Sequence, residues 1–273
     1  MKSAEADLFE ISCWADLLAA APVPIAQSIG LEVREVGGAT TCVAPGIPTL
    51  EFNRAVGLGL RRPAREEDVV ALLDFYRSRG TKTGAIQTIE GATPPGVEAW
   101  LTARGSSPLP RRWVMLTRDA APAQPKPTRL RIAEIAHEHA AAAAEAFCAG
   151  YGMPPAMAGW IASLVGRPRW RCFCAFDGAR IVSTSFLYMD QGRAQLAGAG
   201  TLREARGQGA QGALMAIRIE AARAAGVRIM QSHTGLPLGD EPSPSLDNMR
   251  HAGFRDLHVR INWSVATPGA AAA

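Results

Sequence analysis

Residues 206–214 have the composition and spacing most suggestive of chemistry, with the sequence Arg-Gly-Gln-Gly-Ala-Gln-Gly-Ala-Leu. The segment lies between a strand-like stretch and an amphipathic helical pattern. Its three glycines let the backbone turn and allow a ligand to come close to main-chain N–H groups. The N-terminus of the following helix adds partial positive charge, which favours phosphate oxygens. The sequence therefore predicts a site for a phosphate-bearing ligand.

The same glycines also satisfy the dinucleotide-binding pattern G-x-G-x-x-G, so that alternative needs a test. The pattern requires a buried strand directly before it and an acidic residue about 20 positions later, at the end of the next strand. Residues 202–206 are mostly charged, and the next strand-like run ends at Gln231, Ser232 and His233 without a carboxylate. A P-loop is excluded because no Gly-Lys-Ser/Thr follows the glycines. A nicotinamide or flavin site is therefore not favoured.

The elements around this segment are predicted to be α+β. Before it, alternating and apolar patterns predict strands at 130–135, 169–176, 180–188 and 194–201 and helices at 137–148 and 154–164. The Asp177-Gly178 pair is a strong hairpin signal. After the glycines we expect a long helix ended by Gly226, then a strand at 227–232, a helix at 245–251 and a strand at 254–264.

The first part of the chain has a similar order of elements. It predicts a helix at 66–79, a strand at 85–89, a helix at 97–104 and a final strand containing Trp113. Three pairs of matched positions are separated by about 146 to 150 residues, which suggests a duplicated domain: Gly80 and Gly226, Gly105 and Gly253, Trp113 and Trp263. A Pro/Ala-rich stretch at 119–127 is typical of a linker. Residues 57–63 occupy the position of the glycine segment, but Pro63 removes a donor N–H, so we expect the phosphate site to be lost there.

Composition excludes several classes of protein. The 273 residues carry a net charge of +4 without a run of five like charges, which does not favour nucleic acid as a partner. No apolar run approaches the ~18 residues of a membrane span, and the N-terminus lacks a signal-peptide core, so a cytoplasmic location is expected. Five scattered cysteines are not a disulfide framework. The spacing of Cys172 and Cys174 favours packing over metal binding, and no metal is expected.

Two segments resemble motifs of the GNAT acyltransferases. Residues 206–214 resemble motif A, written Arg/Gln-x-x-Gly-x-Gly/Ala, and residues 245–254 resemble the motif B helix, which ends in Gly-Phe. The resemblance covers about half of the chain, from 130 to 264. It implies an α+β fold with a mixed, mostly antiparallel sheet flanked by helices, present in two copies. Residues 1–120 would be a degenerate copy without a cofactor site, and residues 128–268 an acyl-CoA-binding domain.

The resemblance also implies acetyl-CoA or another acyl-CoA as co-substrate. Main-chain N–H groups of the glycine segment would hold the pyrophosphate, a strand edge would pair with the pantetheine, and the motif B helix would lie near the thiol. The residues implied are Ala199, Gly200, Thr201, Arg206, Gly207, Gln208, Gly209, Ala210, Gln211, Gly212, Ser245 and Asn248. Two positions depart from the pattern: Gln211 replaces a small residue, and Met249 stands where the family often has a tyrosine as general acid.

Acyl transfer to an amine requires a group that takes the amine proton, and a side chain with a pKa near 7 suits that role. His233, expected just after the strand at 227–232, is the first candidate for the base; the competing interpretation is a residue that caps a loop. Tyr188, at a strand end, is a candidate acid, with packing as its alternative role.

The leading hypothesis is an N-acyltransferase acting on a primary amine of a small molecule or peptide, as a monomer or homodimer. The alternative is a catalytically silent CoA-binding or scaffold module, suggested by Met249. A third hypothesis is that the first domain completes the acceptor pocket across the domain boundary.

Overall fold

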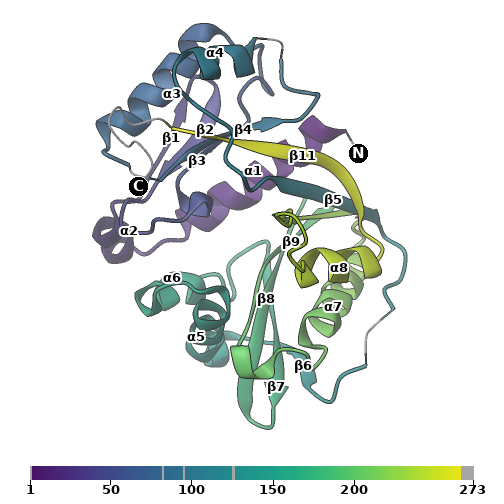
Figure 1. The fold of residues 1–273 in the computed structure, drawn as a ribbon. Helices are drawn as coiled ribbons and strands as arrows, with labels where there is room; N and C mark the ends of the chain where they lie inside the picture. The colour runs from purple at the N-terminus through teal and green to yellow at the C-terminus, as the bar shows by residue number, and fades with distance from the viewer. Residues whose placement is uncertain (1, 82, 95, 125–126, 266–273) are drawn as a thin grey trace.

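A computed structural model describes residues 2–81, 83–94, 96–124 and 127–265. It forms a single sheet of 11 strands, in the order β1-β2-β3-β4-β11-β5-β10-β9-β8-β7-β6, with helices on its faces (Figure 1). Helices α5 and α6 lie on one side of β8, and α7 lies on the other. The sheet therefore runs through both halves of the chain.

The first half contains elements that the sequence patterns predicted and others that they did not. It comprises α1 (Ser3–Ala19), α2 (Val23–Ile29), β1 (Glu32–Val36), β2 (Ala39–Val43), β3 (Arg54–Val56), α3 (Glu66–Ser78), β4 (Ala85–Ile89), α4 (Val97–Ala103) and β5 (Trp113–Asp119). The predictions for α3, β4, α4 and β5 are confirmed. The five elements before α3 had no prediction.

The second half follows the predicted order throughout. It comprises β6 (Arg131–Glu134), α5 (Ala140–Tyr151), α6 (Ala158–Ala162), β7 (Trp170–Asp177), β8 (Arg180–Asp190), β9 (Arg193–Thr201), α7 (Ala210–Ala224), β10 (Ile229–Gly235), α8 (Pro244–His251) and β11 (Arg255–Ser264). The predicted end of the strand at 227–232 was wrong, and the difference changes the position of His233. Strand β10 continues past residue 232, so His233 lies within the strand, opposite Met115 of β5, and not in a loop after it.

Two strand–helix–strand units repeat along the chain. Strands β3 and β4 pair in parallel around α3, and β9 and β10 pair in parallel around α7. Every other strand pair among the described residues is antiparallel. The prediction of a mixed, mostly antiparallel sheet is confirmed, and the repeat of a crossover with the same helix position agrees with a duplicated unit.

The last strand of each half is interleaved with strands of the other half. Strand β11 lies between β4 and β5, with Trp263 opposite Ile86 and Val259 opposite Val114. The other edge of β5 pairs with β10 over seven residues. Each half of the chain therefore supplies a strand that pairs with strands of the other half. Without that strand, edges in both halves of the sheet would be left without hydrogen-bond partners.

Helix α1 packs into the interior between the two halves. Phe9, Trp14 and Leu18 are at most 8% exposed and belong to the larger core cluster, which also contains residues of β7, β8 and α7. Among the described residues no single helix is long and apolar enough to cross a membrane. Helices α1 and α2 taken together have the length and composition of a membrane span, but they meet at an angle of 103°. All five cysteines are buried and free.

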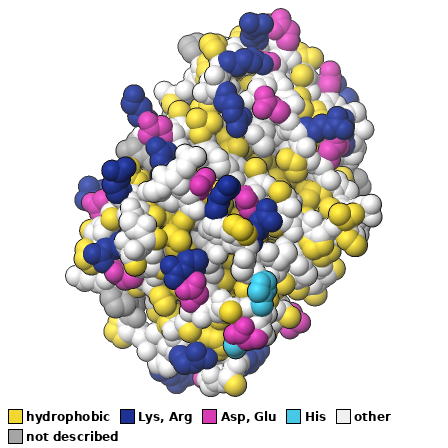
Figure 2. Space-filling view, turned by 180° about the vertical axis from the view of Figure 1, so that it is seen from behind, with side chains coloured by type: hydrophobic (Ala, Val, Ile, Leu, Met, Phe, Trp, Pro, Cys, Tyr) yellow, Lys and Arg dark blue, Asp and Glu magenta, His cyan; other side chains and the backbone are white. Residues whose placement is uncertain are grey.

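The exposed face opposite the view of Figure 1 has no region of a single charge. Figure 2 shows Lys and Arg side chains interspersed with Asp and Glu across that face. Such mixing produces no extended positive field of the kind that binds a nucleic acid backbone.

Candidate functional site

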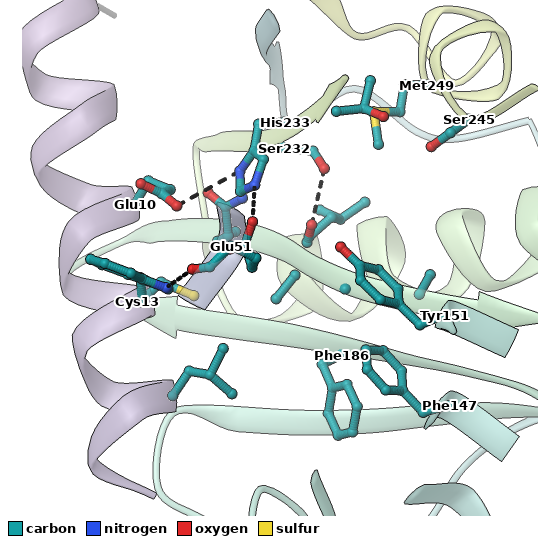
Figure 3. Close-up of a pocket in the computed structure, with 18 of the residues that line it drawn as sticks. Glu10, Cys13, Glu51, Phe147, Tyr151, Phe186, Ser232, His233, Ser245 and Met249 are labelled. Atoms are coloured by element: carbon teal, nitrogen blue, oxygen red, sulfur yellow. Dashed lines mark hydrogen bonds and ion pairs between the residues drawn. The ribbon is translucent and has the colours of Figure 1, made fainter. Parts of the chain in front are cut away.

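A cavity opens where strands β9 and β10 separate. The two strands pair only from Ile229 opposite Arg193 to Gln231 opposite Gln195. Beyond that point Ser232 Oγ still donates a hydrogen bond to the Leu196 carbonyl at 3.0 Å, and a cavity of about 370 Å³ lies between the strands. Its walls come from both halves of the chain, as Figure 3 shows for Glu10 and Glu51 on one side and Ser245 and Met249 on another.

The cavity edge of β9 is shaped by a bulge that a buried arginine holds. The pairing of β8 with β9 shifts register between Ser185 and Phe186, at Gly198. Arg218 of α7 donates Nη1 to the carbonyls of Phe186 and Ala197, at 3.1 and 3.0 Å. Burial lowers the pKa of Arg218 to about 9. Three backbone carbonyls compensate part of that cost, including Leu214 at 3.0 Å, so Arg218 fixes the backbone that lines the cavity.

Glycines 198 and 200 on β9 leave room for helix α5 to pack against the strand. A Cβ atom at Gly198 would lie 2.8 Å from the Phe147 ring, and one at Gly200 would lie 2.6 Å from the Phe147 carbonyl oxygen. The space above these glycines is therefore filled by helix α5. Room for a ligand lies instead along the edge of β9 that faces β10, where the described strands make no pairs beyond Gln195.

The glycine segment forms an open turn at the N-terminus of α7. Gly207 and Gly209 have φ values of +78° and +81°, and Gly209 is the N-cap with no side-chain hydrogen bond. The first-turn N–H groups of a helix have no partner within the helix, and no acidic residue lies in this turn. A Cβ at Gly207 would meet nothing within 4 Å, whereas one at Gly209 would lie 2.7 Å from the Pro127 carbonyl oxygen. Gly207 thus faces open space, and Gly209 allows the chain after the linker to pack.

Gln211 connects the two helices that the resemblance placed near the cofactor. Its Nε2 donates to Ser245 Oγ at 3.3 Å, and its Oε1 accepts a hydrogen bond from Asn248 Nδ2 at 2.8 Å. Gln211, Ser245 and Met249 line the cavity. A glutamine at this motif position therefore ties the first turn of α7 to α8, which a glycine or alanine could not do.

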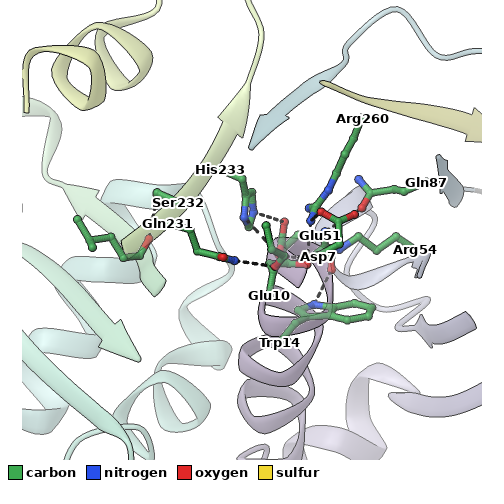
Figure 4. Close-up of polar contacts among 12 residues, drawn as sticks. Asp7, Glu10, Trp14, Glu51, Arg54, Gln87, Gln231, Ser232, His233 and Arg260 are labelled. Carbon is green, nitrogen blue, oxygen red and sulfur yellow. Dashed lines mark hydrogen bonds and ion pairs between the residues drawn. The ribbon is translucent and has the colours of Figure 1, made fainter. Parts of the chain in front are cut away.

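A cluster of buried charges closes the opposite side of the cavity (Figure 4). Arg54 of β3 donates to Glu10 of α1 at 2.7 Å and to Glu51 at 2.9 Å. Arg260 of β11 donates to Asp7 at 2.7 Å and lies 3.5 Å from Glu10. These residues come from α1, the turn before β3 and the last strand, so the cluster joins distant parts of the sequence.

The Arg54 guanidinium is also held between aromatic rings. Its Cζ lies 4.5 Å from the centroid of Trp14 and 5.0 Å from that of Trp113. Glu10 and Arg54 are at most 3% exposed at the side chain. Buried charges are stable only when they are paired, and removing one partner costs several kcal/mol. The cluster is therefore a rigid feature of the fold.

His233 lies between this cluster and the cavity. Its Nδ1 is 3.9 Å from Glu10 Oε1, its Nε2 is 4.0 Å from Glu51 Oε2, and its ring stacks on Trp113 with centroids 5.4 Å apart. Burial opposes the ionisation of Glu51, but Arg54 and then His233 lower the pKa of that carboxyl to about 2. The imidazole thus faces two carboxylates and lines a cavity, an arrangement suited to taking up a proton.

Glu10, Glu51 and His233 also place ligand atoms within 4.8 Å of one another, which is metal-like spacing. However, the Arg54 guanidinium already bridges both carboxylates. With neutral histidines, three carboxylates and two guanidiniums leave this cluster a single negative charge, which a divalent cation would exceed, and we do not propose a metal site.

The two tyrosines near β8 and β9 occupy different positions. Tyr188, the predicted acid, is fully buried, packs on Trp170 with ring centroids 5.2 Å apart, and does not line the cavity. Tyr151, the last residue of α5, lines the cavity, and Figure 3 shows its hydroxyl directed into it. Its ring stacks on Phe147. Tyr188 therefore lies outside the cavity that Tyr151 lines.

Sequence reasoning missed Glu10, Glu51, Tyr151 and Arg218. A signal existed for one of them. Asp7, Glu10 and Trp14 are spaced by three and four residues, which places them on one face of a helix. Acidic residues on the same face as an aromatic residue indicate a buried polar cluster.

Comparison with known proteins shows the fold. No protein-family model matches the sequence, and no curated protein matches it. Solved structures do match. A GCN5-related N-acetyltransferase from Sphaerobacter thermophilus is 17% identical with a TM-score of 0.62, over 89% of this chain and 85% of that one. A tandem GNAT protein from the clavulanic acid biosynthesis pathway is 16% identical with a TM-score of 0.61, over 85% and 80%.

A third match extends over nearly the whole of both chains. A GNAT-family acetyltransferase from Colwellia psychrerythraea is 16% identical with a TM-score of 0.53, and the match covers 97% of each chain. The chain therefore has the fold of the GNAT acetyltransferases through both of its halves.

Proposed function

We propose that this chain, which has the GNAT acetyltransferase fold, transfers an acyl group from acyl-CoA to a primary amine. One observation carries the proposal. A single cavity extends from Gln211, in the first turn of α7, to an imidazole flanked by two carboxylates. The first feature suits a diphosphate, and the second suits an amine that must lose a proton.

The cofactor would lie on the α7 and α8 side of the cavity. Main-chain N–H groups between residues 206 and 212 would hold the diphosphate, and the unpaired edge of β9 at 197–201 would pair with the pantetheine amides. Ser245 and Asn248 would lie near the thiol end, and Gln211 ties them to the first turn of α7. Bound acyl-CoA supplies a thioester carbonyl that is open to attack by an amine. The supporting observation for this side is that α7 has no acidic residue in its first turn.

His233 would accept the proton of the attacking amine. Its position within β10 and its stacking on Trp113 fix the ring, and Glu10 and Glu51 stabilise the imidazolium that forms. For the proton returned to the CoA thiolate we propose Tyr151 in place of Tyr188, because Tyr151 lines the cavity. Met249 has no proton to donate, so the acid has to come from another element.

We further propose that only the second half, residues 128–268, binds cofactor, and that residues 1–120 lack a cofactor site. The first half would supply Glu10, Trp14 and Glu51 to the wall of the cavity on the acceptor side. This arrangement is the one in which the first domain completes the pocket.

Calorimetry with acetyl-CoA, followed by thiol release with a panel of amines, tests the proposal. We expect binding in the micromolar range and thiol release that depends on an amine. An absence of binding at millimolar acetyl-CoA would refute the proposal. Binding without turnover on any amine would instead support the silent CoA-binding module, which the loss of a motif B tyrosine favours.

A further inference from the structure

Resting on the proposed function, we propose that the acceptor is a small primary monoamine with an apolar, aromatic or branched aliphatic body. Its ammonium would lie between Glu51, Glu10 and His233, and its body would lie in the apolar part of the same cavity. Four features of the cavity favour such an acceptor: its excess negative charge, an unsatisfied buried oxygen, its apolar wall and its size.

The charge cluster beside the cavity carries one more negative than positive charge when its histidines are neutral. Asp7, Glu10 and Glu51 are three carboxylates, and Arg54 and Arg260 are the two guanidiniums that pair with them. Glu51 Oε1 pairs with Arg54 at 2.9 Å, whereas Glu51 Oε2 lies 4.0 Å from His233 Nε2. An arriving ammonium would supply the missing positive charge.

The other charged groups around the cavity do not cancel this excess. Arg111 on the rim is paired with Glu241 at 2.9 Å and donates to the Leu236 carbonyl. The Arg218 guanidinium donates its hydrogen bonds to backbone carbonyls of β8 and β9 and not to the carboxylates of the cluster. His258, at 2.8 Å from Asp7, does not line the cavity. Cys13 lines it, but burial raises the pKa of this thiol well above its ordinary value, so it stays neutral.

A second and independent observation points to a donor ligand. Gln195 lines the cavity and is 2% exposed, and its Oε1 has no hydrogen-bond partner among the described residues. A buried carbonyl oxygen without a donor costs roughly 1–3 kcal/mol. A ligand that brings N–H groups would satisfy this oxygen, and an ammonium brings three donors.

Below the carboxylates the cavity wall is apolar. Six of its large side chains are at most 5% exposed: Trp14, Phe52, Ile161, Leu164, Trp170 and Phe186. A second charge on the acceptor would have to lose its water against these rings at a cost of several kcal/mol. A polyamine or an aminoglycoside-like acceptor is therefore disfavoured, and a single charge at one end of an apolar body is favoured.

The size of the cavity limits the acceptor further. Its volume of about 370 Å³ is at the lower end of the ~300–1,000 Å³ typical of small-molecule sites. The acyl end of the cofactor would take part of that volume. The remaining space fits a single ring or a short branched chain.

The test compares matched ligands on the intact chain, with and without acetyl-CoA. Titration of 2-phenylethylamine, 2-phenylethanol and spermidine is followed by tryptophan fluorescence and calorimetry, because Trp14 and Trp113 line the site. We expect the amine to bind at least tenfold more tightly than the alcohol of the same shape and to be the better acyl acceptor of the two amines. Equal binding of amine and alcohol, or preferred acylation of spermidine, would overturn the inference.

Two variants identify the carboxylate. Glu51→Gln is expected to lower the affinity for 2-phenylethylamine at least tenfold and to leave that for 2-phenylethanol unchanged. Glu98→Gln removes an exposed carboxylate of α4 that does not line the cavity, and this variant should bind both ligands like the wild type. Loss of amine binding in both variants would contradict a role for Glu51. The comparison of amine with alcohol on the wild-type chain stands even if Glu51→Gln does not fold.

The same measurements separate this inference from the proposed function. Acetyl-CoA binding with thiol release that favours spermidine would overturn the acceptor class and leave acyl transfer intact. Amine-selective binding without any acetyl-CoA binding would support the ligand class and overturn the acyltransferase. Thiol release that favours 2-phenylethylamine supports both.

Discussion

The two strand–helix–strand units, β3–α3–β4 and β9–α7–β10, share a topology but differ in charge at the start of their helix. In the first unit, Asp68 in the first turn of α3 accepts two hydrogen bonds from Arg62, at 2.7 and 2.6 Å, and one from the Arg65 N–H at 2.8 Å. Glu66 and Glu67 add further negative charge. In the second unit, α7 begins at Gly209 without an acidic residue in its first turn.

The two units also differ in the volume of the cavity between their parallel strands. Between the end of β3 and β4, Leu58 and Gln87 line a cavity of only about 10 Å³, whereas the cavity between β9 and β10 is about 370 Å³. The N-terminus of α3 is thus satisfied by nearby side chains, whereas the N-cap of α7 makes no side-chain hydrogen bond. Under the proposed function, the charge of this helix turn and the space beside it are what distinguish the half that binds the diphosphate from the half that does not.

The largest effect should come from separating the halves. We expect a chain of residues 128–273 to be unable to fold, because β10 loses β5 as its partner and β11 loses both β4 and β5. Near-ultraviolet circular dichroism and urea unfolding would detect the loss of a cooperative transition. Co-expression with residues 1–127 should restore a soluble complex. A cooperative unfolding transition of 128–273 alone would contradict the interleaved sheet.

This interleaving marks the limit of what sequence could predict. Local patterns found all three elements of the second crossover and the helix and second strand of the first, but not β3, because glycines, apolar periodicity and the Asp177-Gly178 turn act over a few residues. They could not show that β11 pairs with β4, since such pairing depends on contacts about 170 residues apart. Glu10 and Glu51 were missed for the same reason: each has a partner, Arg54 or His233, whose position only the tertiary fold determines.

The next largest effect is expected from His233, which faces Glu10 and Glu51 of the first half. We expect His233→Gln to lower kcat by about 10²- to 10⁴-fold with little change in the Kd of acetyl-CoA, because the base is lost and the cofactor side is intact. Steady-state kinetics and calorimetry measure the two quantities.

The two tyrosines are the matched pair for this experiment. Tyr151→Phe should lower kcat about tenfold or more, since its hydroxyl reaches the cavity, while Tyr188→Phe should not change it. An unchanged kcat in His233→Gln would refute His233 as the base, and a larger loss in Tyr188→Phe than in Tyr151→Phe would refute the choice of acid.

A smaller effect follows from giving the second unit a charge like that of the first. Gln211→Glu keeps the shape of the side chain and its contacts with Ser245 and Asn248, but puts a carboxylate in the first turn of α7. We expect acetyl-CoA affinity to fall at least tenfold, about 1.4 kcal/mol, through repulsion of the diphosphate. The helix itself should be stabilised by a few tenths of a kcal/mol. Gln27→Glu in α2 makes the same change of net charge and should bind normally; equal loss in both would exclude a local effect.

The buried charges at the junction of the halves predict an acid-sensitive fold. Burial opposes the ionisation of Asp7, but Arg260 and His258 lower its pKa to about 2, from 3.8. Because the folded pKa is the lower one, the ion pair stabilises the fold above about pH 4, and the stabilisation is lost as pH falls toward 2. For Asp7 the loss is on the order of 2 kcal/mol, and Glu51 adds to it in the same range of pH.

Urea unfolding between pH 5 and 2.5 measures this loss. Asp7→Asn should lower stability at pH 5 and flatten the dependence on pH, whereas Asp74→Asn, at an exposed carboxylate, should retain the wild-type slope. A free energy of unfolding that stays constant over this range would show that the cluster does not hold the halves together.

The smallest effect is expected at the first crossover, and it tests why we propose that the first half binds no cofactor. Asp68→Asn weakens the cap of α3 and its contact with Arg62, which should cost about 1 kcal/mol of stability. It removes one of the three negative charges in that turn, since Glu66 and Glu67 remain, and we expect no second acetyl-CoA site, because the neighbouring cavity of about 10 Å³ cannot admit a pantetheine. Calorimetry on the double variant Asp68→Asn with Gln211→Glu measures binding at the first crossover while binding at α7 is weakened. Binding that appears there would mean that the Asp68 carboxylate alone keeps acetyl-CoA from the first half, and its absence would agree with closure of the strands β3 and β4.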